Sequence, residues 1–265
     1  MNDHVPNSHP RAVSLRTRHV VTEGWKKKVV TTAGLYAHGR GEAFDYLIGE
    51  KTIEPAIEAM EAAVAMMLTA GHPVISINGN VAALCPADMV QLAEAVGAKL
   101  EINLFYREEG RLEAIEKVLK DAGATEILGL QDVEPETIAN LESNRRIVDP
   151  RGIAIADVVM VPLEDGDRTE ALRKVGKKII AIDLNPLSRT AQWAHVTICD
   201  NIIRCGKKMV DIAKRFKEEK TEEQLKVMVA SYDNAKVLSS VIKTMVQYLS
   251  ELGKKGVFLE LPENE

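Results

Sequence analysis

Two consecutive segments of the chain each combine an apolar run, a polar turn and a helix start. One is Val161–Thr169 and the other is Ile182–Thr190. Strands that alternate with helices predict a parallel sheet covered on both faces. Because open α/β proteins bind ligands at the carboxyl ends of their strands, we expect these two loops to line a binding site. Their mixture of carboxylates and arginines suits a magnesium-bound polyphosphate better than an apolar ligand.

The rest of the chain continues this alternation. We expect strands at Val74–Ile77, Leu100–Phe105, Glu126–Leu130, Asp157–Val161, Lys178–Asp183 and Val196–Cys199. We expect helices at about 87–96, 109–122, 135–141 and 168–175. The sequence therefore predicts a Rossmann-like, three-layer α/β/α fold with a mostly parallel sheet, N-terminal helices and a helical C-terminal extension.

The two ends of the chain are predicted to be helical. A first helix is expected from a cap at Ser8 to about Glu23, where Gly24 ends it. Residues 25–42 contain three glycines and are expected to be loop-rich, and a buried helix follows at about 53–69. Helices are expected at 207–217 and 222–252, with a short strand at 256–261. We therefore expect a domain at 1–206 and an extension at 207–265 packed on it.

Composition excludes several classes of partner. The chain has 265 residues, a net charge of −5 and only 4% aromatic residues, which disfavours binding to nucleic acid. No segment is apolar enough for a signal peptide or a membrane span. Cys85, Cys199 and Cys205 show no metal-binding spacing, so we expect reduced thiols and a cytoplasmic protein, with a Cys199–Cys205 bridge left open.

Polar residues at the first strand ends are candidates for binding substrate. Arg40 lies between Gly39 and Gly41, where backbone approaches a ligand closely, although pairing with Glu42 on a surface turn explains it equally. Asn78 and Asn80 follow the first strand and suit a carboxylate or hydroxyls, or else simply form a turn around Gly79.

Arginines and acids mark the next two strand ends. Arg107 and Arg111 are four residues apart, so on a helix they would reach one anion together, unless Glu108 or Glu113 pairs with them. In the loop 164–167, Asp167 fits a capping box with Glu170. Glu164 and Asp165 are therefore the better candidates for contacting metal or substrate.

The last two strand ends favour a nucleotide. Asp183 and Asn185 end one strand, and Arg189 and Thr190 follow the predicted cap Ser188. A helix N-terminus with hydroxyls and an arginine binds phosphate well, and an acid at a strand end accepts hydrogen bonds from ribose. Plain capping by Ser188 explains neither Arg189 nor Asp183. Asp200 and Asn201 are likewise polar residues at the carboxyl end of the next predicted strand.

Several common motifs are absent from the sequence. There is no GxGxxG after a strand, no GxxxxGK[ST] and no GxSxG, and the six histidines show no metal spacing. No histidine or cysteine metal site is therefore predicted, and which carboxylate, if any, contacts Mg²⁺ is left open. The expected chemistry is positioning and charge neutralisation rather than covalent catalysis.

Taken together, these motifs resemble those of the archaeal phosphopantothenate synthetases, or 4-phosphopantoate–β-alanine ligases. The resemblance covers most of residues 8–205, and the segments beyond about Lys207 are similar only in being helical and charged. The matching segments are Ser8–Arg11, Ser14–Arg16, Gly34–Leu47, Ile75–Leu84, Glu101–Tyr106, Ala156–Leu172 and Ile182–Ala191.

The resemblance implies a homodimer that works in coenzyme A biosynthesis and uses ATP and Mg²⁺. The implied reaction joins 4-phosphopantoate to β-alanine and gives 4′-phosphopantothenate, AMP and pyrophosphate, by our hypothesis through an acyl adenylate. The implied ATP site comprises Arg18, Arg40, Asp183, Leu184, Asn185, Arg189, Thr190, Asn201 and Ile202. The catalytic candidates are Arg40, Arg189 and His38, and the substrate-binding candidates are Asn78, Asn80 and Arg107.

Two other functions remain open at this point. A kinase acting on a small phosphorylated acid would use the same arginine-rich loops but would produce ADP. An ATP-binding regulatory protein would need only the nucleotide pocket, whereas this chain has polar residues at several further strand ends.

Overall fold

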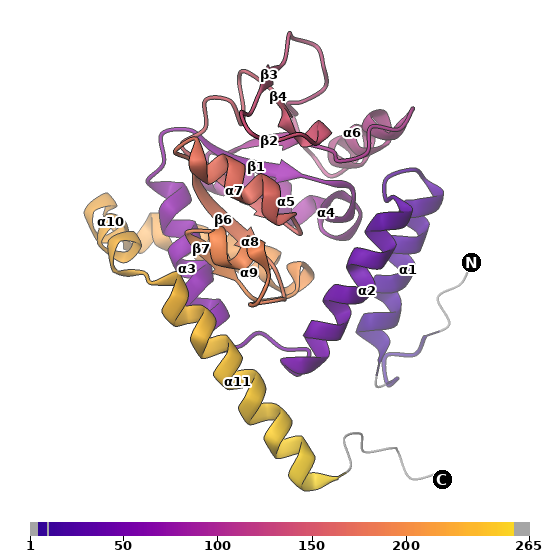
Figure 1. Cartoon of the computed structure of the whole chain (residues 1–265), viewed down its shortest axis with the longest axis vertical. Helices are drawn as coiled ribbons and strands as arrows, with labels where there is room; N and C mark the ends of the chain where they lie inside the picture. Colours follow the sequence, from indigo (N-terminus) through magenta and orange to yellow (C-terminus); the bar gives the residue numbers. More distant parts are fainter. Residues whose placement is uncertain (1–4, 10, 257–265) are drawn as a thin grey trace.

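A five-stranded parallel sheet forms the centre of the molecule (Figure 1). The computed structural model describes residues 5–9 and 11–256. The strand order is β2-β1-β5-β6-β7, and every neighbouring pair is parallel. The strands are β1 Pro73–Ile77, β2 Lys99–Ile102, β5 Val158–Pro162, β6 Lys178–Ile182 and β7 Val196–Ile198. The predicted three-layer α/β fold is confirmed.

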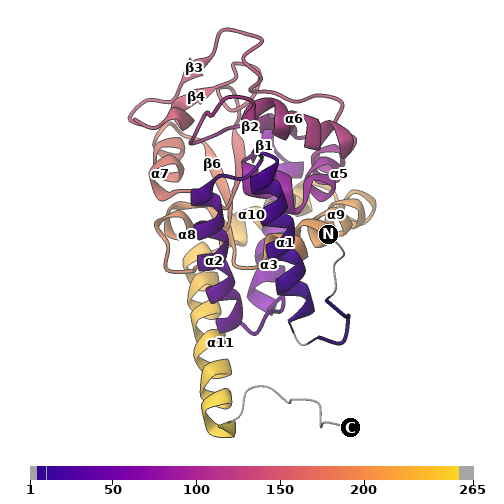
Figure 2. The ribbon, with the colours of Figure 1, turned by 90° about the vertical axis from the view of Figure 1, so that its right-hand side faces the viewer.

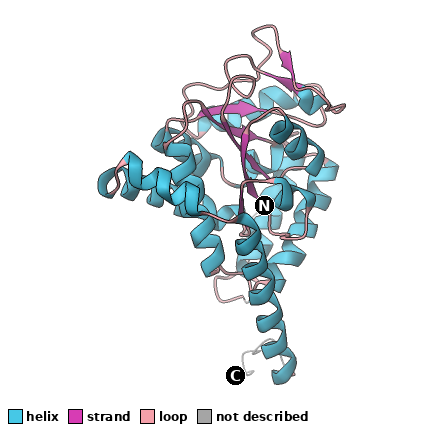
Figure 3. Cartoon of the chain, turned by 60° about the vertical axis from the view of Figure 1, so that its left-hand side comes forward, coloured by secondary structure: helices cyan, strands magenta, loops and turns pink. Residues whose placement is uncertain are grey.

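Helices cover both faces of this sheet, and each face has its own apolar core (Figure 3). Alternate residues of a strand point to opposite faces, so Ile180 and Ile182 join one core while Ile179 and Ala181 join the other. Helices α3 (Glu54–Leu68), α5 (Pro86–Val96) and α9 (Ile202–Glu219) pack on the first face. Helix α7 (Gly166–Lys174) packs on the second face, and α8 (Arg189–Trp193) packs against α7 while its Ala191 joins the first core.

Two N-terminal helices lie side by side next to the sheet (Figure 2). They are α1 (Ala12–Lys26) and α2 (Thr32–Leu47). Ser8 is not the cap that was predicted, because Arg11 occupies that position, and Gly24 does not end α1. A Cβ at Gly24 would lie 2.9 Å from the Val30 side chain, so the glycine lets the following turn fold back on the helix.

The predicted loop at 25–42 is wrong over most of its length, because α2 runs through all three glycines. Thr31 caps α2 by accepting a hydrogen bond from the Gly34 amide at 3.2 Å. Each helical glycine costs about 1 kcal/mol relative to alanine, so tertiary packing and not propensity must stabilise this helix. Its contacts with α1 and with α4 (Gly79–Leu84) supply that packing.

The segment between β2 and β5 differs most from its prediction. Leu128 forms one bridge to Glu101 where a strand was expected at 126–130. The helix expected at 135–141 is instead β3 (Glu136–Thr137) and a loop, and β3 pairs with β4 (Ile147–Val148). A short 3-10 helix, η1 (Asn144–Arg146), precedes β4, and α6 (Arg111–Asp121) follows β2. The buried side chains of Ile138 and Leu141 explain the apolar spacing that looked helical.

Helices also form the C-terminal part of the chain. Helix α9 starts at Ile202, five residues before the expected start, and the boundary at residue 206 stays a prediction. The single helix expected at 222–252 is two, α10 (Glu222–Ser231) and α11 (Asn234–Lys255), because the Asp233 side chain caps α11. Helix α11 projects beyond the rest of the molecule (Figure 1). The strand expected at 256–261 lies, from residue 257 onward, outside the described residues.

Candidate active site

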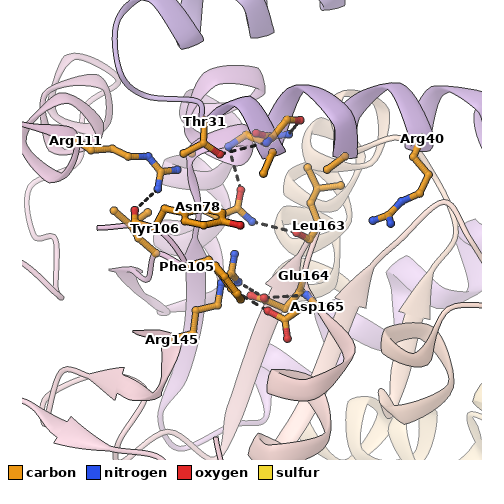
Figure 4. A pocket seen from close by; sticks show the side chains of 16 residues that line it. Thr31, Arg40, Asn78, Phe105, Tyr106, Arg111, Arg145, Leu163, Glu164 and Asp165 are labelled. Atoms are coloured by element: carbon orange, nitrogen blue, oxygen red, sulfur yellow. Dashed lines mark hydrogen bonds and ion pairs between the residues drawn. The ribbon is translucent and has the colours of Figure 1, made fainter. Parts of the chain in front are cut away.

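The strand order reverses between β1 and β5, and a cavity of about 260 Å³ lies at the carboxyl ends of these two strands. This is the position at which open parallel sheets bind ligands. Helix α2 forms its roof, and side chains from four other segments form its walls (Figure 4). Its polar and charged lining comprises Thr31, Arg40, Asn78, Asn80, Tyr106, Arg111, Arg145, Glu164 and Asp165.

Asn78 and Asn80, two of the predicted substrate-binding residues, form the floor of the cavity below α2. The Asn78 side chain caps α4 by accepting from the amides of Asn80 and Val81, and its amide group donates to the Pro162 carbonyl at 2.9 Å. Asn80 donates to the Gly34 carbonyl at 2.8 Å. A Cβ at Gly34 would lie 2.3 Å from Oδ1 of Asn80, so only glycine permits α2 to lie this close.

Arg111 forms one end of the cavity and keeps its positive charge. It is buried at the start of α6, and it donates to the backbone carbonyls of Val29 at 3.3 Å and Tyr106 at 2.5 Å. Burial lowers the pKa of its guanidinium. A Cβ at Gly79 would lie 2.6 Å from this guanidinium and 2.1 Å from the Val29 carbonyl oxygen, so Gly79 makes room for both.

Arg145 forms the adjacent wall and belongs to a buried charge cluster. It extends from η1 and contacts Glu164, whose second oxygen accepts from Arg168 at 2.5 Å. Asp165 caps α7 by accepting from the Arg168 amide, so the predicted cap at Asp167 is wrong. Burial lowers the pKa of Arg145 to about 9, and it therefore stays charged at neutral pH.

A narrower cavity of about 50 Å³ continues from the first one below α2. The two share Ala37, Asn80 and Leu163 as lining residues. The second cavity gathers four of the predicted residues, which are His38, Leu184, Asn201 and Ile202. Arg40, two residues after His38 on the same helix, lines the first cavity, so α2 connects the candidate substrate residues to the candidate ATP residues.

His38 has an unusual environment within this second cavity. Its Nε2 atom is buried and has no hydrogen-bond partner among the described residues. Burial lowers the pKa of the imidazole, so the ring is neutral at neutral pH. A neutral, unpartnered imidazole is suited to accept a proton or a hydrogen bond from a ligand.

The loop after β6 is shaped by its own polar side chains. Asp183 accepts from Ser188 Oγ at 2.5 Å and from the Asn185 amide at 2.9 Å, and burial raises its pKa. Ser188 caps α8, which confirms the capping interpretation of that serine. Thr190 is buried and donates to the Glu164 carbonyl at 3.0 Å, which ties this loop to the loop after β5.

Three predicted arginines do not line either of these two cavities. Arg18 on α1 pairs with Glu42, and Arg189 pairs with Asp167 and Glu170 at the edge of a separate groove of about 470 Å³. Arg107 lines a small pocket with Gly129 and Asp149. Arg107 precedes α6, so the expectation that it shares a helix face with Arg111 is wrong.

Sequence reasoning did not name Arg145 or Arg168 as site residues. Arg168 appeared only as the arginine at the predicted helix start of the segment Val161–Thr169, and Arg145 lies in a stretch without helical or strand periodicity. The one signal for Arg145 was the pair of arginines at 145 and 146, which is too common on surfaces to be specific. Its role depends on a contact with Glu164, 19 residues away, that local sequence does not encode.

The acids of the site are already engaged by protein partners. Glu164 contacts two arginines, Asp165 caps a helix, and Asp183 accepts from Ser188. Within residues 5–9 and 11–256, no group of three or more histidine, cysteine or acidic side chains is arranged to hold a metal ion. Cys85, Cys199 and Cys205 are free thiols, all of them buried. None of the described helices is long and apolar enough to cross a membrane.

Comparison with known proteins identifies the family. A family model described as phosphopantothenate/pantothenate synthetase matches residues 55–248. The chain belongs to this family. It is 53% identical to a protein of Thermococcus kodakarensis named 4-phosphopantoate–β-alanine ligase, over 96% of this chain and 97% of that one. A protein of the same name from Methanosarcina mazei is 47% identical, over 94% and 96% of the two chains. The resemblance noted in the sequence is therefore confirmed.

Proposed function

We propose that this chain joins 4-phosphopantoate to β-alanine with ATP and releases 4′-phosphopantothenate, AMP and pyrophosphate. The names of its relatives and the arrangement of the two cavities support this proposal. The observation that carries it is the pairing of an arginine-walled cavity with a narrower one lined by nucleotide-type residues, both beneath α2. A ligase that activates a phosphorylated acid needs such a pair of adjacent subsites.

The arginine-walled cavity is the proposed subsite for 4-phosphopantoate. Arg111 and Arg145 lie at one end and carry positive charge in a buried setting, which favours a phosphate. Asn78 and Asn80 at the floor supply amide groups for the hydroxyl and carboxylate of the acid. This assignment places the substrate phosphate at Arg111 and Arg145 rather than at Arg107.

The narrower cavity and the loop after β6 are the proposed subsite for ATP. Leu184, Asn201 and Ile202 line this cavity, and Asp183 and Asn185 shape the loop beside it. Arg40 extends from α2 and lines the arginine-walled cavity (Figure 4), and its positive charge acts on Asp183 in the loop after β6. We propose that Arg40 neutralises the α-phosphate when the carboxylate attacks it, with Arg18, Arg189 and Thr190 contacting the rest of the nucleotide.

The chemistry proceeds in two steps in this proposal. A carboxylate oxygen of 4-phosphopantoate attacks the α-phosphorus of ATP, the α–β phosphoanhydride bond breaks, and pyrophosphate leaves. The β-alanine nitrogen then attacks the acyl carbon, and AMP leaves with the electron pair of the broken C–O bond. The amine loses a proton in the second step. His38, which is neutral and has an unpartnered Nε2 in the narrower cavity, is our candidate to accept it.

Magnesium enters as a part of the substrate in this scheme. The carboxylates near both cavities are engaged by arginines, a helix N-terminus or a serine, so the protein offers no ready set of free ligands. We propose that Mg²⁺ is bound by the ATP phosphates and neutralises the departing pyrophosphate, as phosphate-bound magnesium commonly does.

We also propose a cytoplasmic homodimer. Helix α11 leaves Ile242, Val246 and Leu249 exposed along its projecting part, which is an apolar stripe suited to a second copy. Sedimentation of the full chain is expected to give twice the mass of 29.2 kDa. A variant truncated before Glu222 that stays dimeric would remove the C-terminal helices from the interface.

The deciding experiment is a product assay with purified full-length protein. ATP, Mg²⁺, 4-phosphopantoate and β-alanine are supplied together and with each acid omitted in turn, and the nucleotides are separated. We expect AMP, pyrophosphate and 4′-phosphopantothenate to accumulate only when both acids are present. Production of ADP would replace the proposal with phosphoryl transfer, and ATP binding without turnover would replace it with a regulatory role.

A further inference from the structure

A second arginine lies behind the cavity wall, out of reach of any ligand. Arg168 extends from α7 and is fully buried. It donates to Glu164 at 2.5 Å and to Ser76 Oγ at 3.0 Å. Glu164 in turn contacts Arg145, which lines the cavity whereas Arg168 does not. One glutamate therefore bridges an arginine of the site and an arginine of the protein interior.

The charges at this wall balance only when Arg168 is counted. Glu164 and Asp165 are both close to Arg145, with Asp165 Oδ2 at 3.7 Å from its Nε. These three side chains alone would carry a net charge of −1 and would oppose a phosphate. Arg168 brings the sum to zero, which leaves Arg111 and Arg40 to make the cavity positive. Buried charges act strongly because the surrounding medium screens them weakly.

Arg145 also depends on this cluster for its position. It lies in the excursion between β2 and β5, where the only sheet among the described residues is the two-residue pairing of β3 with β4. Asn103 holds the backbone by donating to the carbonyls of Arg145 and Ile147. The Arg145 guanidinium itself contacts only Glu164 and Asp165 among the described residues, so Glu164 determines its direction.

We propose that Arg168 is a positioning residue for the substrate phosphate. It fixes Glu164 against Arg145 and offsets the negative charge of this wall, so that the cavity accepts a dianionic phosphate. The inference rests on the proposed function for the identity of the substrate. The inference states that Arg168 controls phosphate affinity without contacting phosphate. Binding measurements test this statement without any need for turnover.

The experiment compares three variants of the full-length protein. Arg168→Gln removes the charge and keeps hydrogen-bonding groups, Arg168→Lys keeps the charge, and Arg168→Gln/Glu164→Gln removes one charge of each sign. The affinity for inorganic phosphate is measured by calorimetry. The KM values for 4-phosphopantoate and ATP are measured beside it, and circular dichroism checks that each variant is folded.

We expect Arg168→Gln to weaken phosphate binding and to raise the KM for 4-phosphopantoate by about 10- to 100-fold, with the KM for ATP changed less than about threefold. The double variant restores the wall to zero net charge, and the amide oxygen that Glu164→Gln keeps at this position can still accept from Arg145. It is therefore expected to recover most of the loss, and Arg168→Lys is expected to lose about threefold or less. If Arg168 had only a structural role, the double variant would bind phosphate no more tightly than Arg168→Gln does.

Each outcome decides the inference. Unchanged phosphate affinity in folded Arg168→Gln, or no recovery in the double variant, overturns it. If Arg168→Gln does not fold, the double variant and Arg168→Lys still decide, because near-normal phosphate affinity in both is required. Failure of the wild-type product assay would refute the proposed reaction but would leave the phosphate titration interpretable.

Discussion

The buried arginine at the end of the cavity and the exposed arginines outside it, which we call the rim arginines, differ in what they contact. Arg111 donates to the carbonyls of Val29 and Tyr106, which are neutral groups, and it is buried. Arg189 is 60% exposed and pairs with two carboxylates, those of Asp167 and Glu170. Arg18 likewise pairs with Glu42. A buried arginine held by carbonyls keeps its charge available to a ligand, whereas an exposed, paired one must first exchange partners.

This difference affects how strongly each arginine can bind a ligand. Exposed ion pairs contribute about 0–1 kcal/mol and are screened by salt, while charge-assisted hydrogen bonds in a buried site are stronger. We therefore expect the buried arginines to hold the phosphorylated acid before turnover. The rim arginines are better suited to a flexible triphosphate that changes charge during the reaction.

The largest effect on substrate binding is expected for Arg111→Met. Loss of a buried charge at the proposed phosphate subsite is expected to raise the KM for 4-phosphopantoate about 100-fold, or roughly 2.7 kcal/mol, with little change in the KM for ATP. Steady-state kinetics with each substrate varied in turn measures this effect.

Arg107→Met is the matched comparison for that measurement, because the sequence named Arg107 as a substrate-binding candidate and left the anion open to both Arg107 and Arg111. The cavity assigns it to Arg111. A large loss of 4-phosphopantoate affinity at position 107 and none at position 111 would reverse the structural assignment and with it the contrast between buried and exposed arginines.

Arg145 also shows where prediction from the sequence reached its limit. The strands β1, β5, β6 and β7 were predicted closely because buried parallel strands are continuous apolar runs. Asn78, Asn80 and Asn201 were found because strand ends and helix caps are local features. Arg145 required knowing that residues 131–156 fold back over the sheet, which depends on contacts distant in sequence.

Helix α2 was missed for a different physical reason. Its three glycines are unfavourable in helices, and its low amphipathicity gives no periodic signal. The glycines make sense only in the folded chain, where Gly34 lies against Asn80. Because α2 is the roof of both cavities, this error hid the fact that His38 and Arg40 belong to one helix rather than to a flexible loop.

A second prediction concerns Glu101, which anchors the segment that follows Arg145. Its carboxylate accepts from the amides of Asp149 and Ile153, and burial raises its pKa to about 7. The folded state therefore holds a proton that the unfolded state releases above its usual pKa of 4.5. This group stabilises the fold most below about pH 4.5, and its contribution is lost as the pH rises to about 7.

The comparison of wild type with Glu101→Gln isolates that effect from every other group that titrates. The variant's stability relative to wild type is expected to improve by about 3 kcal/mol between pH 4.5 and pH 8, whatever its absolute stability. Denaturant unfolding at four pH values measures this difference. A constant difference over that range would mean that Glu101 is already ionised in the folded protein.

The smallest effect on stability is expected for Arg189→Ala, which changes one of the exposed arginines. Its two ion pairs lie at the surface, so the free energy of unfolding is expected to change by less than about 1 kcal/mol. The KM for ATP is expected to rise by up to about tenfold, because the side chain must leave Asp167 and Glu170 to reach a phosphate.

Asp167→Asn is the matched control, since it frees the same guanidinium from one partner and is expected to lower the KM for ATP slightly. If Arg189→Ala keeps both full turnover and an unchanged KM for ATP, Arg189 belongs only to the surface, and the buried arginines with Arg40 must neutralise the triphosphate without it.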